Sequence, residues 1–141
     1  MKILVAIDGS ENALRALQKV VDYRDRFTSP LSLGLMNVHD NTSLKHAARV
    51  LGAQAVRDYV HDQAEHQLAP ALRLVEDRGV DHQKIIATGP VAPTLIEEAQ
   101  TQGYDMIALG ARGSGALQDW LMGSVAQRVS ATSPVPVLLV P

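Results

Sequence analysis

Five short apolar runs alternate with stretches of helical periodicity along the chain, at residues 3–7, 31–38, 84–87, 105–109 and 135–140. The first, fourth and fifth runs are nearly continuous in apolar residues, which is typical of strands buried on both faces. Strands that alternate with helices form parallel sheets, because parallel neighbours need a long crossover connection. The pattern therefore predicts a single α/β domain over residues 1–141, with a doubly wound parallel sheet of five strands and helices on both faces.

The first half of the chain predicts two helices. Ser10 is the expected N-cap of the first one, with Glu11 in its first turn. A longer helix is predicted over residues 56–75, where apolar residues recur at helical spacing. Pro70 lies inside it and predicts a kink or a split, because proline removes a backbone donor. Residues 40–52 are the least regular stretch, and we expect either a mobile segment or the irregular start of this helix.

Two further helices are predicted in the second half. One extends from about Pro93 to Gln102, with Pro93 at its first position and Gly103 just past its end. The other follows Gly123 and ends before Pro134, because the residue that precedes a proline is driven out of the helical region.

Charge and composition exclude several classes of protein. Lys and Arg number 13 against 15 Asp and Glu, so the formal net charge is −2, which argues against nucleic-acid binding through a basic field. Cysteine is absent, which excludes thiolate catalysis and disulfides and makes the reducing cytoplasm the expected compartment. The run 3–7 is too short for a signal-peptide core or a membrane span, so we expect no direct membrane insertion.

The segment from Gly110 to Ser124 is the most informative part of the chain. Ligands of open parallel sheets bind at the carboxyl ends of the strands, and this glycine-rich segment follows the fourth predicted strand. Gly123 and Ser124 begin a helix, whose unpaired N–H groups and partial positive charge stabilise phosphate oxygens. Arg112 adds a charge-assisted contact. The alternative is an ordinary glycine-rich turn with Ser124 as an N-cap.

Two common phosphate-binding signatures are absent. The chain contains no G-x-x-x-x-G-K-[ST], and no G-x-G-x-x-G follows the first apolar run. A P-loop NTPase and an NAD enzyme are therefore disfavoured. No metal site is expected either, since His61 and Glu65 supply only two ligands on one helix face.

The spacing Gly110-x-x-Gly113, nine residues, Gly123-Ser124 resembles the nucleotide loop G-x-x-G-x9-G-[ST] of the universal stress protein family. The segments 3–10 and 123–140 are similar to that family as well. The resemblance implies ATP binding, a strand order of 3-2-1-4-5, and therefore a first strand that brings Asp8 alongside Gly110. It also implies homodimers.

The resemblance assigns roles toward ATP, with Mg²⁺ as the expected companion ion. The expected binding residues are Ile7, Asp8, Val38, Leu109, Gly110, Arg112, Gly113, Gly123, Ser124 and Val125. Val38 would hold adenine through its backbone, Leu109 and Gly110 would line the ribose, and the last five residues would surround the phosphates. Asp8 would contact the ribose or a metal-bridged phosphate. Its alternative role is to bond backbone amides of the turn that starts the first helix.

The last strand is expected at an edge of the sheet, where Val137 to Val140 leave an apolar ladder unpaired. Pairing with the same strand of a second copy would cover this ladder, provided that Pro136 faces away from it or lies at its start. We therefore expect a homodimer through Val137 to Val140. His39 is expected either to contact the base or to cap the turn, and Trp120 to pack the loop or face a partner.

The sequence thus predicts an ATP-binding regulatory module of the stress response, a nucleotide-dependent switch with an unknown downstream protein partner. No catalytic residue is assigned, because no Lys follows Lys84 and no Glu or Gln lies near a strand end to orient water. Turnover of ATP is expected on the order of once per hour or slower. The alternatives are a slow ATP hydrolase or phosphotransferase, and an interaction module that binds no nucleotide.

Overall fold

The sheet has five parallel strands in the order β3-β2-β1-β4-β5, as predicted. The structure is a computed structural model that describes residues 1–112 and 121–141. The strands are β1 (Lys2–Ala6), β2 (Ser32–His39), β3 (Asp81–Thr88), β4 (Met106–Gly110) and β5 (Val137–Val140). Central strands β1 and β4 are almost fully buried, whereas edge strand β5 is half-buried.

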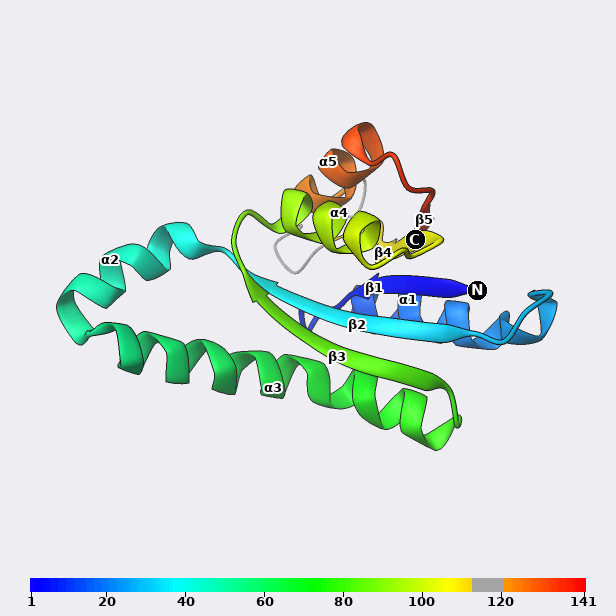
Figure 1. The fold of residues 1–141 in the computed structure, drawn as a ribbon, viewed down its shortest axis with the longest axis horizontal. Coiled ribbons are helices and arrows are strands. Elements are labelled where there is room, and N and C mark those ends of the chain that lie inside the picture. The colour runs from blue at the N-terminus through cyan, green and yellow to red at the C-terminus, as the bar shows by residue number, and fades with distance from the viewer. Residues whose placement is uncertain (113–120) are drawn as a thin grey trace.

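Helices cover both faces of the sheet (Figure 1). The helices are α1 (Glu11–Asp22), α2 (Asn41–Leu51), α3 (Ala53–Asp77), α4 (Val91–Thr101) and α5 (Ser124–Thr132), with a short 3₁₀ turn at Arg24–Arg26. One hydrophobic core joins α1 and α3 to the sheet, and a second core joins α4 and α5 to its other face. None of the helices within residues 1–112 and 121–141 is both long and apolar enough to cross a membrane.

Residues 41–51 form the regular helix α2, so the expectation of an irregular stretch was wrong there. The Asp40 carboxylate caps this helix by accepting a hydrogen bond from the Thr42 amide at 2.8 Å. Gly52 separates α2 from α3 with a φ of 88°, a conformation that glycine adopts without the steric cost that a side chain would bring. The Asp40 cap and Gly52 thus define the start and the end of α2, which the polar composition of this segment did not predict.

Helix α3 continues through Pro70, so of the two predicted outcomes, a kink or a split, the split does not occur. Its buried stripe lies on both sides of the proline and packs against the sheet: Val60, Ala64, Leu68, Ala71 and Val75. This packing offsets the one backbone hydrogen bond that a proline removes. Helix α4 also begins two residues earlier than predicted, with Pro90 as its N-cap and Pro93 as its third residue. Proline is tolerated there because the first amides of a helix have no intrahelical partner.

The chain leaves β1 and β4 toward opposite faces of the sheet. After β1 it enters α1 in the first core, and after β4 it leads to α5 in the second core. Because β1 and β4 are hydrogen-bonded neighbours, their carboxyl ends form the switch point at which open parallel sheets bind ligands.

Candidate functional site

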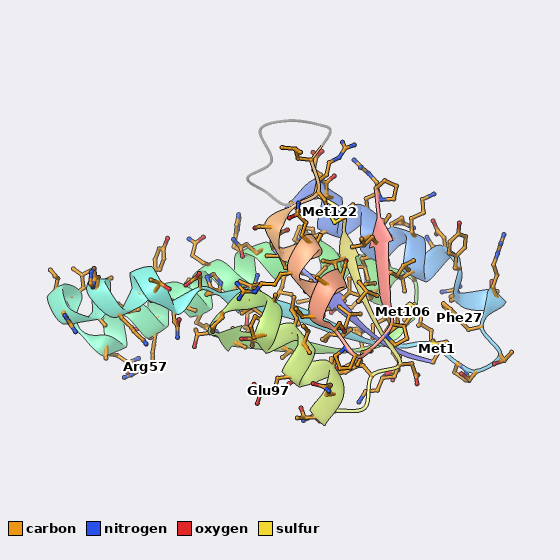
Figure 2. All side chains as sticks on the ribbon, turned by 90° about the horizontal axis from the view of Figure 1, so that it is seen from above. Met1, Phe27, Arg57, Glu97, Met106 and Met122 are labelled. Atoms are coloured by element: carbon orange, nitrogen blue, oxygen red, sulfur yellow. The ribbon has the colours of Figure 1, made fainter. Side chains whose placement is uncertain are left out.

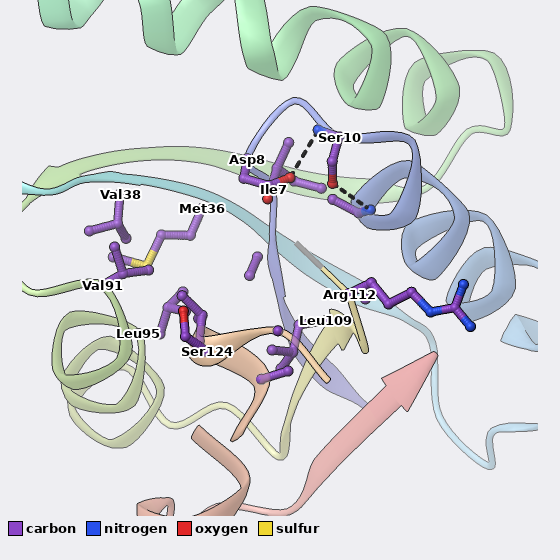
Figure 3. A pocket seen from close by; sticks show the side chains of 16 residues that line it. Ile7, Asp8, Ser10, Met36, Val38, Val91, Leu95, Leu109, Arg112 and Ser124 are labelled. Atoms are coloured by element: carbon purple, nitrogen blue, oxygen red, sulfur yellow. Dashed lines mark hydrogen bonds between the residues drawn. The ribbon is translucent and has the colours of Figure 1, made fainter. Parts of the chain in front are cut away.

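A cleft opens at this switch point, and Figure 3 shows the side chains around it. It is lined by the ends of β1, β2 and β4 and by residues of α1, α4 and α5. Nine of the ten predicted binding residues lie in its walls: Ile7, Asp8, Val38, Leu109, Gly110, Arg112, Gly123, Ser124 and Val125. The tenth, Gly113, lies outside the described residues, as does Trp120. Segments that are distant in the sequence are thus brought to one place.

One half of the cleft is apolar. Met36 and Val38 of β2, Val91 and Leu95 of α4, and Leu109 of β4 form this wall. β2 continues to His39, whereas its register with β1 ends at the pair Ala6 and Met36. Val38 therefore lies beyond the part of β2 that pairs with β1, so its main chain borders the cleft. An apolar wall beside a strand end of this kind suits a flat ring that needs backbone hydrogen bonds at its edge.

The other half of the cleft is the N-terminus of α5. Gly123 is the N-cap of this helix, and no side chain within residues 1–112 and 121–141 caps the first amides of α5. The Gly123 amide itself donates to the Ala111 carbonyl at 2.8 Å, which fixes the helix start against the end of β4. Ser124, Val125 and Ala126 follow in the cleft wall. Unpaired N–H groups at a helix start attract anionic oxygens, so this half of the cleft suits a phosphate.

Asp8 has the turn-forming role that was its alternative interpretation. Its Oδ1 accepts a hydrogen bond from the Ser10 amide at 2.9 Å, and Ser10 Oγ accepts one from the Ala13 amide at 3.2 Å. Ser10 is therefore the N-cap of α1, as predicted. Asp8 also lines the cleft. The two roles are compatible, because a carboxylate has a second oxygen and further lone pairs with which to meet a ligand.

Gly110 is required by packing against α1. A Cβ placed on Gly110 would lie 2.9 Å from the Asn12 carbonyl oxygen and 3.0 Å from Asn12 Cβ. A close approach of α1 to the end of β4 thus explains this glycine without any ligand. Arg112 also lines the cleft, but its guanidinium points away from Ser124 and Asp8 in Figure 3. The expected contact of Arg112 with phosphate therefore needs a different rotamer.

His39 does not belong to the cleft. Side chains alternate along a strand, so His39 lies on the face of β2 opposite Val38, on the side of α3. Burial lowers the pKa of the His39 imidazole, and its Nε2 is buried without a hydrogen-bond partner among the described residues. The expected contact with a base is thus not supported. His61 and Glu65 pair at 3.6 Å, and Glu65 is also bound by Lys84.

Several cleft residues were not predicted, among them Met36, Val91 and Leu95. Met36 could have been predicted from Val38, because side chains two residues apart in a strand lie on the same face of the sheet. Val91 was missed because the predicted start of α4 lay two residues too late. Leu95 lay inside the predicted helix, and its place in the cleft wall depends on how α4 packs on the sheet.

Known proteins are similar to this chain in both sequence and fold. The chain is 31% identical to the universal stress protein YxiE of Bacillus subtilis, over 99% of this chain and 97% of the relative. The solved structure of MJ0577 from Methanocaldococcus jannaschii matches with a TM-score of 0.85 and 27% identity, over 99% of this chain and 94% of that one. A universal stress protein family protein of Arabidopsis thaliana with AMP bound shares the fold, with a TM-score of 0.68 and 17% identity over 99% of this chain and 90% of that one.

These likenesses extend over almost the whole chain, so they include every strand and helix that forms the cleft. The model of one family, described as the universal stress protein family, matches residues 1–141 without a gap at either end. The chain belongs to the universal stress protein family.

Proposed function

We propose that the cleft binds ATP and that the chain is a nucleotide-dependent regulatory module of the cytoplasm. The observation that carries this proposal is the meeting of two unlike walls, the apolar wall around Val38 and Leu95 and the N-terminus of α5, which begins at the glycine N-cap Gly123. Neither wall alone specifies a ligand. Together they match a molecule with an apolar ring at one end and phosphates at the other.

The adenine ring fits against the apolar wall, with its edge at the main chain of Val38. The phosphates fit at the amides of α5 beside Ser124, with Gly123 leaving room because it carries no Cβ. Asp8 is the acidic residue among the described residues of the cleft wall, and its second carboxylate oxygen is the group that would meet Mg²⁺ or a ribose hydroxyl. The Arabidopsis relative with bound AMP supports an adenine nucleotide as the class of ligand.

A charge placed at the start of α5 tests the phosphate half. Ser124→Asp adds a carboxylate where the phosphates are proposed to lie, so ATP should bind at least about tenfold more weakly because like charges repel. The same carboxylate favours the helix N-terminus, so thermal stability should be kept or raised. The matched control is Ser130→Asp on the same helix, which is exposed and outside the cleft.

Isothermal titration calorimetry with ATP and AMP measures the affinity of the wild type, Ser124→Asp and Ser130→Asp for each nucleotide. Unchanged ATP affinity in Ser124→Asp would exclude the helix start as the phosphate site. A parallel variant, Gly123→Val, should also weaken ATP binding, since its side chain would fill the space left for phosphate. Equal affinities for ATP and AMP would show that the site recognises only the adenosine monophosphate part that the two nucleotides share.

We propose that turnover is negligible. The residues known to line the cleft include no Lys, Glu, Gln or His, and hydrolysis of ATP needs charge stabilisation and an oriented water. A turnover on the order of once per hour or slower is expected, measured as phosphate release with Mg²⁺. The second candidate, an ATP hydrolase, would be supported by turnover faster than about once per second.

A further inference from the structure

Another groove lies away from the proposed nucleotide cleft. Helix α2 and the first half of α3 extend beyond the carboxyl end of the sheet, as Figures 1 and 2 both show. Between them and the end of β3 lies a groove of about 330 Å³, which we call the α2–α3 groove. It has no lining residue in common with the nucleotide cleft.

The floor of the α2–α3 groove is apolar. Leu44 of α2, Val56 and Val60 of α3 and Ile86 of β3 form it. Of these, Val60 is 6% exposed and the others are half-buried. A volume of this size lies within the range of small-molecule sites, about 300–1,000 Å³. A folded protein partner would need a much larger contact, about 800 Å² on each side.

Among the described residues that line the groove, the ionisable ones are all basic or histidine, namely Lys45, Arg57 and His61. This local excess of positive charge contrasts with the net charge of −2 for the whole chain. Lys45 forms no hydrogen bond or ion pair in the part of the chain that the structure describes. Arg57 donates one hydrogen bond to Gln54 Oε1 at 2.9 Å, which leaves other N–H groups of its guanidinium available.

We propose that the α2–α3 groove binds an amphipathic carboxylate, a medium-chain fatty acid or a molecule with the same acyl chain and acid group. The acyl chain lies on the floor formed by Leu44, Val56 and Val60. The carboxylate lies at the rim between Lys45 and Arg57, where the charges of ligand and groove are complementary. This proposal goes beyond nucleotide binding, since it concerns a separate site between α2, α3 and the end of β3.

Titration with decanoate, octanoate and decan-1-ol, all below micelle-forming concentrations, tests the chemistry. We expect one saturable site for decanoate, observed by calorimetry and by amide chemical shifts of Leu44 and Val56. Octanoate should bind about tenfold more weakly, because two methylenes leave the apolar floor. Decan-1-ol should bind at least about fivefold more weakly than decanoate, because it lacks the charge.

Variants of α2 test the position of the acid group. Lys45→Gln should weaken decanoate binding by about three- to tenfold and leave decan-1-ol unaffected. The matched control is Arg49→Gln on the same helix, which is exposed and does not line the groove. Both substitutions are at exposed sites, so circular dichroism should show an unchanged fold. Ser124→Asp should bind decanoate like the wild type, which separates this site from the nucleotide cleft.

The proposal is overturned if decanoate shows no saturable binding, or if decan-1-ol and decanoate bind equally well. It is also overturned if Lys45→Gln and Arg49→Gln have the same effect. Binding of an acidic amphipathic peptide without any binding of decanoate would assign the groove to a protein partner instead. Concentration-dependent self-association that Val56→Asp abolishes, again without decanoate binding, would assign it to a second copy of this chain.

Discussion

The Asn37 side chain of β2 donates a hydrogen bond to Gln67 Oε1 of α3 and another to the Ile7 carbonyl, each at 2.8 Å. Asn37 is only 1% exposed. Gly9 packs on the same glutamine, since a Cβ at Gly9 would lie 2.8 Å from Gln67 Cγ. The turn that contains Asp8 is thus held against α3 by the contacts of Ile7 and Gly9 with Asn37 and Gln67.

Removing this amide should destabilise the protein. Asn37→Ala leaves the Gln67 and Ile7 oxygens without their donor in a buried place, and we expect unfolding to cost about 2–4 kcal/mol less. Urea unfolding at neutral pH measures this. The control is Gln18→Ala, which removes an exposed amide bonded to Asp22 Oδ1 at 2.8 Å and should change stability by less than about 0.5 kcal/mol. Equal effects of the two substitutions would contradict the role assigned to Asn37.

The ends of the apolar runs were sufficient to predict the α/β class and the carboxyl ends of the strands, whereas the strand order and most of the cleft residues came from the resemblance to the universal stress protein family. The sequence was not sufficient to predict the structural role of Asn37, because its two hydrogen bonds depend on the register of β2 with β1 and on the position of α3. Gly110 shows a related limit. Its place in a glycine motif indicated a role in nucleotide binding, whereas a Cβ at this position would first meet Asn12, which only the packed structure reveals.

Gly34 and Tyr104 should be energetically coupled. A Cβ at Gly34 would lie 2.2 Å from the Tyr104 hydroxyl, which accepts a hydrogen bond from Gln83 at 2.6 Å. Gly34→Ala should therefore cost about 1–3 kcal/mol through overpacking. Tyr104→Leu removes the clash, so the double variant should be more stable than the sum of the single effects by at least about 0.5 kcal/mol. Strict additivity in urea unfolding would show that the two sites are independent.

The stability of the protein should depend on pH through His39. Burial lowers the pKa of His39 from 6.5 in the folded state, so between the two pKa values the unfolded chain binds more protons. The free energy of unfolding should then be highest above about pH 7 and decrease as the pH falls through 6.5 toward the folded pKa.

His39→Gln should flatten this part of the profile. Unfolding measured between pH 7.5 and 5.5 avoids the titration of Asp22, Asp40 and Glu65, whose pKa values are lowered further by their hydrogen bonds. His46→Gln, at an exposed position of α2, serves as the control and should keep the wild-type slope. If both variants retain that slope, His39 is not its source.

The free edge of β5 should mediate dimer formation. The carbonyls of Pro136 and Val140 accept hydrogen bonds from the Ile107 and Ala111 amides, respectively, on the β4 side. Because backbone groups alternate along a strand, the amides of Val137 and Leu139 face away from β4. Pro136 precedes β5, at the start of the ladder, so it does not interrupt the free edge.

Leu139→Pro removes one outward amide without removing a donor to β4, so it should convert a dimer into a folded monomer. Leu138→Pro is the matched variant, because it removes an amide on the β4 side and should lower thermal stability instead. Light scattering coupled to size-exclusion chromatography gives the mass of each. Edge pairing depends on the outward amides. The proposed dimer contact at β5 would therefore be excluded if the wild type is monomeric at about 100 µM, or if the Leu139→Pro variant remains dimeric.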